Sequence, residues 1–547
     1  MNPINLKKNQ ELEVEIIDLS HEGLGVAKVE NYPLFIENAL PGERVKIKVI
    51  KVGNRFGYAR VIEMLETSPD RQAVANEDLL RTGIAPLSHL AYDKQLAFKQ
   101  EQVEKVMAKI AKMPNVEVRP TVGMENPIAY RNKAQIPVRK LQGTLVTGFY
   151  RKNSHEILPI EDFYIQDPAI DEAIIKVRGI LERFNITAYN EEFNEGFLRH
   201  IIIRRGHYTH QMMVVLVTRR AKFFKGQEIA AIIKEEIPEV VSVMQNINEE
   251  KTNVILGEKE KVLFGQDYIE DQLLGNTYRI SSKSFYQVNT VQAEKLYKKA
   301  FELAELKPTD VVIDAYAGIG TIGLSIAKDV RHVYGMEVVE EAVADANKNA
   351  EINGIENATY LVGKAEKTMK QWEKAEIAAD VVFVDPPRKG LEASFIEATC
   401  EMKPKKVIYI SCNPATMARD LVLFNEKGYK AKVVQPVDLF PQTHHVETVV
   451  LLSQRKADNH IEVDLDLDGL DVTSAESKAT YNEIQQYVLK ETGLMVSNLY
   501  IAQIKKKCGI DVGECFNKPK TENAKQPKCP EDKEKAIKDA LKHFGMI

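Results

Sequence analysis

Apolar runs of strand length alternate with helical patterns along the second half of the chain. Runs that are apolar and largely β-branched begin at five valines, namely Val311, Val333, Val381, Val407 and Val446. Before and between them, apolar residues recur at helical spacing over 292–304, 321–328 and 342–353. Because alternating strands and helices are typical of a mainly parallel sheet, the pattern predicts a Rossmann-like α/β domain over residues 286–456.

Three other segments have different patterns. Residues 1–68 contain short alternating stretches and glycine turns, which predict a small OB-like β-barrel. Residues 69–285 mix strand-like pairs with helical stretches and predict an α+β domain, whose helix near 92–111 we expect to pack on the α/β domain. Residues 457–547 predict a linker and a small helical extension of unknown role.

A cysteine follows one of the predicted strands. The strand V-I-Y-I at 407–410 leads into S-C-N-P and then into a helical pattern, so Cys412 lies at a strand's carboxyl end and beside a helix N-terminus. Ligands of open α/β sheets bind at that edge, and a helix N-terminus favours a thiolate. The alternative is a small buried core residue, which is common for cysteine.

The neighbouring strands favour the functional interpretation of Cys412. One strand runs through Asp314 into a glycine-rich turn, another ends in Asp385 before two prolines, and Glu447 enters the last strand. Polar groups at four strand ends of one sheet favour an active site over four separate accidents. We therefore expect these residues to lie together at one edge.

The glycine turn indicates a nucleotide-like cofactor. Gly318, Gly320 and Gly323 match G-x-G-x-x-G after a strand, and Glu337 ends the next strand. An acid there suits the ribose of a nicotinamide cofactor or of S-adenosylmethionine. Asp314 would repel a pyrophosphate and suits a cationic sulfonium amino acid, so we predict S-adenosylmethionine. A nicotinamide-dependent oxidoreductase is the alternative.

Composition and charge narrow the class of protein. The chain has 547 residues, and its formal net charge of -5 means that any nucleic-acid surface must be a local patch. The N-terminus has no apolar signal core and no run is long enough to span a bilayer, so we expect no membrane association. No cysteine precedes Cys400, which fits a reducing cytoplasm.

The predicted barrel carries a local basic patch. Six basic residues surround Phe56 and Tyr58: Arg44, Lys46, Lys48, Lys51, Arg55 and Arg60. Basic residues interleaved with aromatic ones suit RNA, because phosphates and bases can be bound together. A solvated barrel face with two core aromatics is the alternative.

Five motifs carry a resemblance to a known family. They are S-F-Y-Q-V-N at 284–289, D-A-Y-A-G-I-G-T-I-G at 314–323, D-P-P-R-K-G at 385–390, S-C-N-P-A-T at 411–416 and H-H-V-E-T-V at 444–449. With them, roughly residues 5–455 resemble the S-adenosylmethionine-dependent RNA uracil-5-methyltransferases. The barrel, with G-L-G-V-A and P-G-E-R-V, resembles the TRAM domain. Family members acting on 23S ribosomal RNA commonly have this domain, and bacterial members acting on tRNA generally lack it.

The resemblance implies a reaction and residue roles. Cys412 matches the nucleophile that adds to C6 of uracil, and Glu447 matches the base that removes the C5 proton. The implied cofactor-site residues are Gln287, Tyr316, Glu337 and Asp385, which the glycine turn extends with Asp314, Gly318 and Gly320. We expect a monomer that methylates a uridine, in 23S ribosomal RNA. A tRNA substrate and an RNA-binding protein without catalysis are the alternatives.

One departure from the family concerns a metal cluster. Many members hold an iron–sulfur cluster with four cysteines, but the corresponding stretch 71–90 has none, and the fourth position falls at Phe163. Thiolates are the ligands of such clusters. We therefore expect neither an iron–sulfur cluster nor another metal.

Overall fold

The computed structural model describes residues 6–152, 154–375, 377–454, 481–508, 510, 529–544 and 546. Within this part, the chain divides into two compact units, Met1–Asp458 and Asn459–Ile547. No helix in the described residues has the length and apolar character that crossing a bilayer requires.

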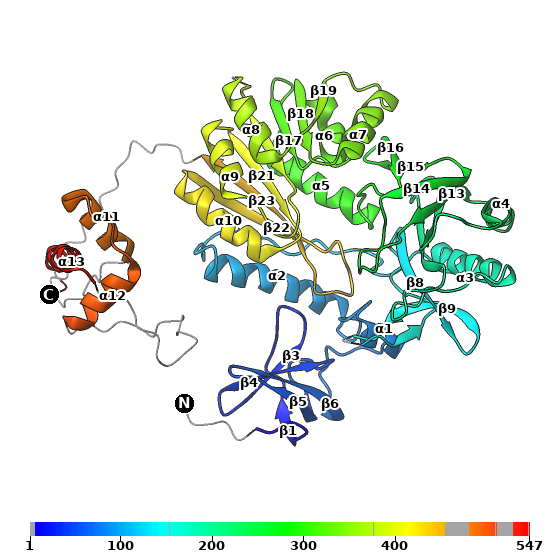
Figure 1. Ribbon diagram of the computed structural model, residues 1–547, viewed down its shortest axis with the longest axis horizontal. Coiled ribbons are helices and arrows are strands. Elements are labelled where there is room, and N and C mark those ends of the chain that lie inside the picture. Colours follow the sequence, from blue (N-terminus) through cyan, green and yellow to red (C-terminus); the bar gives the residue numbers. More distant parts are fainter. Residues whose placement is uncertain are drawn as a thin grey trace. The chain divides into compact units, whose positions relative to one another are not determined.

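A mainly parallel sheet organises the α/β part of the first unit (Figure 1), with strand order β19-β18-β17-β20-β21-β23-β22-β7. In chain order the bounds are β7 Glu117–Val118, β17 Val311–Ala315, β18 His332–Glu337, β19 Ala358–Val362, β20 Val381–Val384, β21 Lys406–Ser411, β22 Tyr429–Val437 and β23 Glu447–Gln454. Neighbours from β19 to β21 are parallel, whereas β23 is antiparallel to β21 and β22. The predicted fold class is confirmed, with β7, β19 and β22 in addition to the predicted strands.

Helices cover both faces of this sheet. Their bounds are α2 Tyr92–Lys109, α5 Thr290–Ala304, α6 Thr321–Ile326, α7 Glu340–Ile352, α8 Ala365–Lys374, α9 Ala393–Glu401, α10 Pro414–Glu426 and the 3-10 turn η1 Ala327–Asp329. Successive strand side chains point to opposite faces: Phe383 packs with α5, α6 and α7, and its neighbour Val384 packs with α2, α8, α9 and α10. Burial on both faces explains why these strands are continuous apolar runs.

A second sheet, of order β10-β9-β8-β11-β12-β13-β14, is formed by the middle part of the unit's sequence and is called the middle domain. The bounds are β8 Lys133–Leu141, β9 Thr144–Tyr150, β10 Ile157–Pro159, β11 Leu198–Arg205, β12 Met212–Thr218, β13 Val240–Ile247 and β14 Lys259–Gly265, with a hairpin of β15 Tyr268–Leu273 and β16 Asn276–Ser281. Helices α3 Pro168–Arg183 and α4 Gly226–Glu236 cover one face. Met213 and Val215 on the other face share a core with α5, so this sheet is joined to the α/β part.

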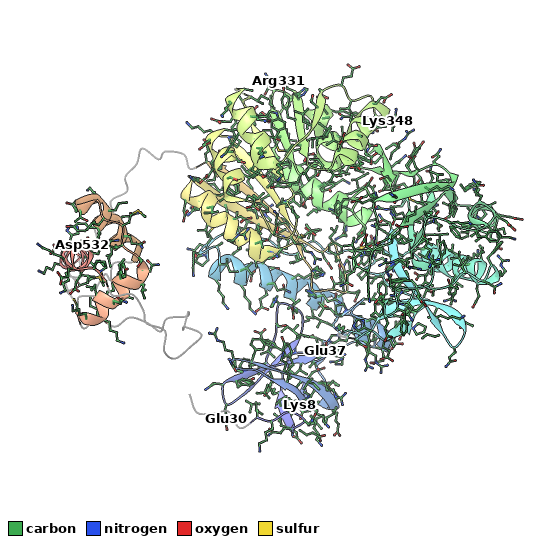
Figure 2. All side chains as sticks on the ribbon, viewed as in Figure 1. Lys8, Glu30, Glu37, Arg331, Lys348 and Asp532 are labelled. Carbon is green, nitrogen blue, oxygen red and sulfur yellow. The ribbon has the colours of Figure 1, made fainter. Side chains whose placement is uncertain are left out.

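The N-terminal strands form the predicted barrel, in the order β1-β5-β6-β4-β3-β2. The bounds are β1 Glu11–Glu15, β2 Asp18–Leu19, β3 Gly25–Val29, β4 Tyr32–Glu37, β5 Arg44–Val52 and β6 Gly57–Glu66, followed by α1 Glu77–Thr82. Leu34, Ile36, Val45 and Ile47 are fully buried in its core. Figure 2 shows the side chains of this unit, with Lys8, Glu30 and Glu37 labelled on the barrel.

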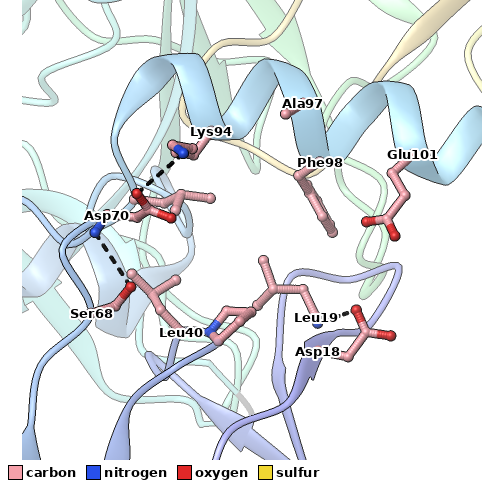
Figure 3. A pocket seen from close by; sticks show the side chains of 11 residues that line it. Asp18, Leu19, Leu40, Ser68, Asp70, Lys94, Ala97, Phe98 and Glu101 are labelled. Atoms are coloured by element: carbon pink, nitrogen blue, oxygen red, sulfur yellow. Dashed lines mark hydrogen bonds and ion pairs between the residues drawn. The ribbon is translucent and has the colours of Figure 1, made fainter.

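A cavity of about 320 Å³ lies between the barrel and α2 (Figure 3). Leu19 and Leu40 of the barrel and Phe98 of α2 line its apolar part. Lys94 pairs with Asp70 at 3.4 Å beside it. None of the predicted site residues lines this cavity, so it is separate from the candidate active site.

A buried ion pair joins α2 to the loop before β23. Lys99 Nζ lies 2.5 Å from Asp438 Oδ1 and donates to the Phe440 carbonyl at 3.1 Å, and both charged side chains are fully buried. The Tyr92 hydroxyl donates to the other Asp438 oxygen at 2.9 Å. Gln95 and Gln442 exchange two hydrogen bonds of 3.0 Å. This network holds the chain that leads to Glu447.

The second unit contains α11 Tyr481–Thr492, α12 Asn498–Lys507 and α13 Glu531–His543. Ile484, Val488, Ile501, Ile537 and Leu541 are buried together between these helices. The helices of the predicted extension are present, and Gly493, directly after α11, has the left-handed φ of +68° that suits a residue after a helix.

We predict that Lys99→Met destabilises the first unit by about 3–5 kcal/mol, because it leaves the Asp438 carboxylate buried without a charge of opposite sign. Lys105→Met is the matched control, since Lys105 forms exposed pairs with Glu101 and Asp18, and it should cost at most about 1 kcal/mol. Denaturant unfolding followed by Trp372, the single tryptophan, measures both. Equal effects of the two variants would contradict a special role for the buried pair.

Candidate active site

The sheet topology brings five of the predicted site residues to one edge. Asp314 lies near the carboxyl end of β17 and Glu337 ends β18, while Asp385 and Cys412 directly follow β20 and β21. Because these strands are parallel, their carboxyl ends form a single edge. Glu447 begins β23, and the antiparallel pairing of β23 with β21 brings it to the same edge.

The turn after β17 has unusual backbone geometry. Tyr316 has a φ of +64°, in the left-handed region that is costly for a tyrosine, and Gly318 and Gly320 have φ of +55° and +84°. A Cβ at Gly323 would lie 2.8 Å from Asp314 Oδ2 and 2.6 Å from the Tyr360 hydroxyl. Glycine at this position therefore lets α6 approach the strands closely.

Two acids hold this turn through backbone hydrogen bonds. The Gly323 N–H donates to Asp314 Oδ2 at 2.8 Å, and the Gly318 N–H donates to Glu337 Oε2 at 3.1 Å. Glu337 Oε1 also accepts from the Val338 N–H at 2.7 Å. Asp314 Oδ1 is buried and has no hydrogen-bond partner among the described residues. A buried acceptor without a donor suits a ligand that brings a cationic or N–H group.

Gln287 approaches the same edge from the loop between β16 and α5. Asn132 of the middle domain fixes this loop, because its side chain donates to the Gln287 carbonyl and to Thr290 Oγ1, both at 3.0 Å. The Gln287 side chain interacts with the Tyr297 hydroxyl. Sequence reasoning missed Asn132 and Tyr297, since nothing in their local patterns separates them from structural residues.

Three carboxyl groups in the site have strongly raised pKa values. Burial raises the pKa of Asp385 to about 7. Burial, with the Asp385 charge as a smaller cause, raises the pKa of Glu447 to about 8. Burial also raises the pKa of Asp314 to about 7, and the charges of Asp385 and Glu337 add to this. Asp385 thus acts on both neighbours, and a buried carboxyl with a pKa near neutrality can exchange protons with a substrate.

The electrostatics of Cys412 differ from the sequence-based expectation. Burial raises the pKa of Cys412 to about 11, the charges of Glu447 and Asp385 add to the rise, and the Arg388 charge opposes it. Cys412 directly precedes Asn413, the N-cap of α10, but this helix end does not produce a lowered pKa. The thiolate prediction was wrong for the free protein, because desolvation and two carboxylates outweigh the helix end.

Helix α10 anchors the loop that carries Asp385 and Arg388. Asp420, fully buried, accepts from the Leu391 N–H at 2.8 Å and from the Tyr409 hydroxyl at 2.8 Å. Thr416 Oγ1 donates to the Arg388 carbonyl at 3.2 Å. A Cβ at Gly390, whose φ is +79°, would lie 2.5 Å from Asp420 Oδ2. Sequence reasoning missed Asp420, although an acid on the apolar side of a helix is a signal for a buried partner.

Phe163, which occupies the position of the family's fourth iron–sulfur cysteine, lies in an apolar environment. Phe163 is fully buried, and its ring packs edge-on against Phe149 with 5.5 Å between centroids. In the stretch 71–90, Leu79 and Ala85 pack with Tyr130 and Ile165. Apolar packing thus occupies these positions, while the expected absence of an iron–sulfur cluster stays a prediction.

Comparison with known proteins places these features in a family. A sequence model of tRNA (uracil-5-)-methyltransferases matches residues 91–455, and one of the TRAM domain matches residues 5–62. A protein of Enterococcus faecalis described as an uncharacterized RNA methyltransferase is 54% identical over 449 residues, which are 82% of this chain and 98% of that protein. A similarly described protein of Streptococcus mutans is 55% identical over 447 residues, which are 82% of this chain and 99% of that protein.

A solved structure is also similar. The Pyrococcus abyssi tRNA (uracil-54, C5)-methyltransferase in complex with S-adenosyl-L-homocysteine superposes with a TM-score of 0.65 at 27% identity. The match covers 80% of this chain and 99% of that one.

We predict that Asp314→Asn weakens S-adenosylhomocysteine binding by about 10-fold or more, because it removes a buried anionic acceptor. The same change should stabilise the free protein at pH 8 by about 1–3 kcal/mol. The folded-state pKa of Asp314 lies above its unfolded value, so wild-type stability falls as pH rises from about 4 to about 7, and asparagine cannot ionise. Calorimetry and denaturant unfolding at pH 5 and 8 measure the two effects.

The exposed Asp329 provides the control variant, Asp329→Asn, which should change neither property. Unchanged affinity in Asp314→Asn would contradict a cofactor role for this edge of the sheet.

Proposed function

The chain belongs to the tRNA (uracil-5-)-methyltransferase family, and on that premise we propose that it methylates C5 of a uridine in 23S ribosomal RNA through a covalent adduct at Cys412. The family transfers methyl groups from S-adenosylmethionine, and this chain is such an RNA methyltransferase. The nicotinamide-dependent alternative for the glycine turn is therefore set aside.

One observation supports the covalent mechanism above the others. The Cys412 thiol, directly after β21, and the buried Glu447 carboxyl, at the start of β23, lie close enough that the Glu447 charge raises the pKa of Cys412. Glu447 is 5% exposed and Cys412 is partly exposed. A base that is shielded from water beside a nucleophile that a substrate can reach is the pair that addition and elimination at a pyrimidine require.

The residues around the glycine turn fit S-adenosylmethionine. Asp314 Oδ1, buried without a partner, can accept from the ammonium group of its amino acid end. Glu337, at the end of β18, can accept from the ribose hydroxyls. We propose that Gln287, Tyr316, Asp385, Gly318 and Gly320 complete this site. When bound, S-adenosylmethionine supplies an electrophilic methyl group and a positive charge.

In the first step of the proposal, Cys412 activates the uracil ring. Free uracil C5 is a poor nucleophile, but the Cys412 thiolate can add to C6 and move the C5–C6 π electrons toward C5 and O4. The thiol must lose its proton first, and its raised pKa means that this loss has to be coupled to binding of the reactants. Arg388 favours the thiolate, since its charge lowers the pKa of Cys412.

The second step uses Glu447. After C5 has accepted the methyl group, it holds both the methyl and a proton. Glu447 takes that proton, the electrons of the C5–H bond restore the double bond, and the bond between C6 and the Cys412 sulfur breaks. The Glu447 pKa of about 8 gives the carboxylate a basicity suited to proton removal near neutral pH.

Support for a ribosomal substrate comes from the barrel. The TRAM match at residues 5–62 corresponds to the domain that members acting on 23S ribosomal RNA commonly have. The Pyrococcus abyssi structure, whose protein acts on tRNA, favours uridine in tRNA as the second candidate. In either case the uridine must be unstacked to reach a cysteine at a sheet edge.

The mechanism predicts opposite effects of two substitutions on a trapped complex. Cys412→Ala should abolish turnover and keep S-adenosylhomocysteine binding, because the thiol reacts with the uracil. Glu447→Gln should lower turnover by about 10²–10⁴-fold and accumulate methylated RNA attached to Cys412. A denaturing gel with labelled RNA shows the complex as a slow band. A band with Cys412→Ala, or full activity in either variant, would refute the roles.

Substrate choice is tested by supplying unmodified 23S ribosomal RNA and unmodified tRNA in parallel with labelled methyl donor. We expect label at C5 of uridine in the ribosomal RNA and little in tRNA. Mapping by nuclease digestion and mass spectrometry identifies the nucleotide. Efficient methylation of tRNA alone would establish the second candidate instead.

A further inference from the structure

The turn between β2 and β3 of the barrel is held by its own hydrogen bonds and contains a buried glycine. The Gly23 N–H donates to the Ser20 carbonyl at 2.8 Å, and the Ser20 N–H donates to the Leu24 carbonyl at 2.8 Å. Gly23 is buried, although its neighbours His21 and Glu22 are exposed. Turns normally lie in solvent, so the burial of Gly23 means that this turn packs against another part of the chain.

The buried side of the barrel turn faces Leu87 and the loop 438–446, which joins β22 to β23. Gly23 has a φ of +76°, and a Cβ at this position would lie 2.7 Å from Leu87 Cδ2 and 3.8 Å from His444 Cβ. Leu87 is fully buried, so its methyl group cannot move aside into solvent. Glycine therefore lets the barrel turn approach this loop more closely than any other residue would.

Electrostatic effects also place the barrel turn beside His444. Burial lowers the pKa of His444 to about 4, the His445 charge adds to the fall, and the Glu22 charge of the barrel turn opposes it. The two imidazole rings lie 4.3 Å apart between centroids. Burial also lowers the pKa of His445 to about 4, and the Arg388 charge adds to this fall. His444 and His445 thus connect the barrel turn to the residues of the candidate active site.

Gln442 fixes the middle of the loop 438–446 in an unusual conformation. Its φ of +68° lies in the left-handed region, and it is 2% exposed. Its carbonyl accepts from the Leu87 N–H at 2.9 Å, and its side-chain amide donates to the Pro127 carbonyl at 3.3 Å. Two further hydrogen bonds join it to Gln95. Such a conformation persists only where its surroundings impose it, and Leu87 connects those surroundings to the barrel turn.

We propose that Gly23 is a positioning residue for Glu447, because the barrel turn that it allows to pack here holds the loop 438–446 in place. The inference rests on the proposed function and concerns its last step. In that step Glu447 takes the C5 proton, the C5–H electrons restore the C5–C6 double bond, and the C6–S bond breaks to release the Cys412 thiolate.

Displacement of the loop should affect this last step more than the earlier ones. Cys412 follows β21 and the glycine turn follows β17, so neither the nucleophile nor the proposed cofactor site is carried by the loop 438–446. Glu447 directly follows that loop. A displacement of about 1 Å at a reacting group can cost about 10²-fold in rate. A shifted barrel turn should therefore slow elimination while addition and methyl transfer continue.

Gly23→Ala tests this role, with Gly42→Ala as the matched control. Both glycines lie in barrel turns with left-handed φ, +76° and +82°, but a Cβ at Gly42 would meet no atom of the described residues within 4 Å. Single turnovers of unmodified 23S ribosomal RNA and of unmodified tRNA with labelled methyl donor separate methyl transfer from release. Gly23→Ala should slow release about 10-fold or more, accumulate the Cys412 adduct and keep methyl transfer within about 2-fold. Gly42→Ala should behave as the wild type.

A second substitution separates positioning from a general defect of the barrel. Valine lacks the Cδ2 methyl group that a Cβ at residue 23 would meet, so Leu87→Val in the Gly23→Ala background should restore release toward the wild-type rate. S-adenosylhomocysteine calorimetry confirms that each variant is folded. Release that stays slow in the double variant would contradict the proposed contact.

An engineered disulfide tests the contact without RNA. A Cβ at residue 23 would lie 3.8 Å from His444 Cβ, and disulfides have a Cβ–Cβ separation of about 3.8 Å. Gly23→Cys with His444→Cys should form a cross-link with oxidised glutathione, which mass spectrometry of a digest detects, whereas Gly42→Cys with His444→Cys should not.

The proposal is overturned if the cross-link does not form, or if Gly23→Ala releases methylated RNA as fast as the wild type. Failure of the wild type to methylate either RNA would overturn the proposed function instead. The two proposals can therefore fail separately.

Discussion

The direction of β23 is the constraint on which the candidate chemistry depends. Parallel strands deliver only their carboxyl ends to the ligand-binding edge, and Cys412 arrives there after β21. Since β23 runs antiparallel, its first residue, Glu447, reaches the same edge from the opposite direction. The loop before it is fixed to α2 by the buried pair of Lys99 and Asp438. An ion pair between residues 339 positions apart in the sequence thus helps to fix the position of Glu447, the proposed proton acceptor.

The same edge of the sheet gathers buried carboxyl groups whose ionisation is unfavourable in the free protein. Asp314, Asp385 and Glu447 all have pKa values raised chiefly by burial, so ionising them costs stability as pH rises. Such a site favours a cationic ligand, which relieves the cost on binding. This is a trade of stability for function of the kind common at active sites. The charges of Glu447 and Asp385 also add to the raised pKa of Cys412, which keeps its thiol protonated in the free protein near neutral pH.

Much of the site could be predicted from sequence, because strand ends and glycine turns are local signals. Asp314, Glu337, Asp385 and Cys412 each follow or end an apolar run, and parallel topology then places them together. Interactions between distant residues were not predictable. The protonated state of Cys412 depends on Glu447 and Asp385, and the neutralisation of Lys46 and Lys48 depends on Glu11. Lys99 resembles an ordinary surface lysine in a polar helix until the fold buries it.

Trapping of the wild-type protein on RNA with 5-fluorouridine at the target position tests the central claim most directly. Fluorine at C5 cannot leave as a proton does, so addition and methyl transfer should proceed and elimination should stop. Mass spectrometry of the digested complex should then find the methylated fluorouridine linked to the peptide that contains Cys412. Turnover without any adduct, or an adduct on another residue, would contradict the account.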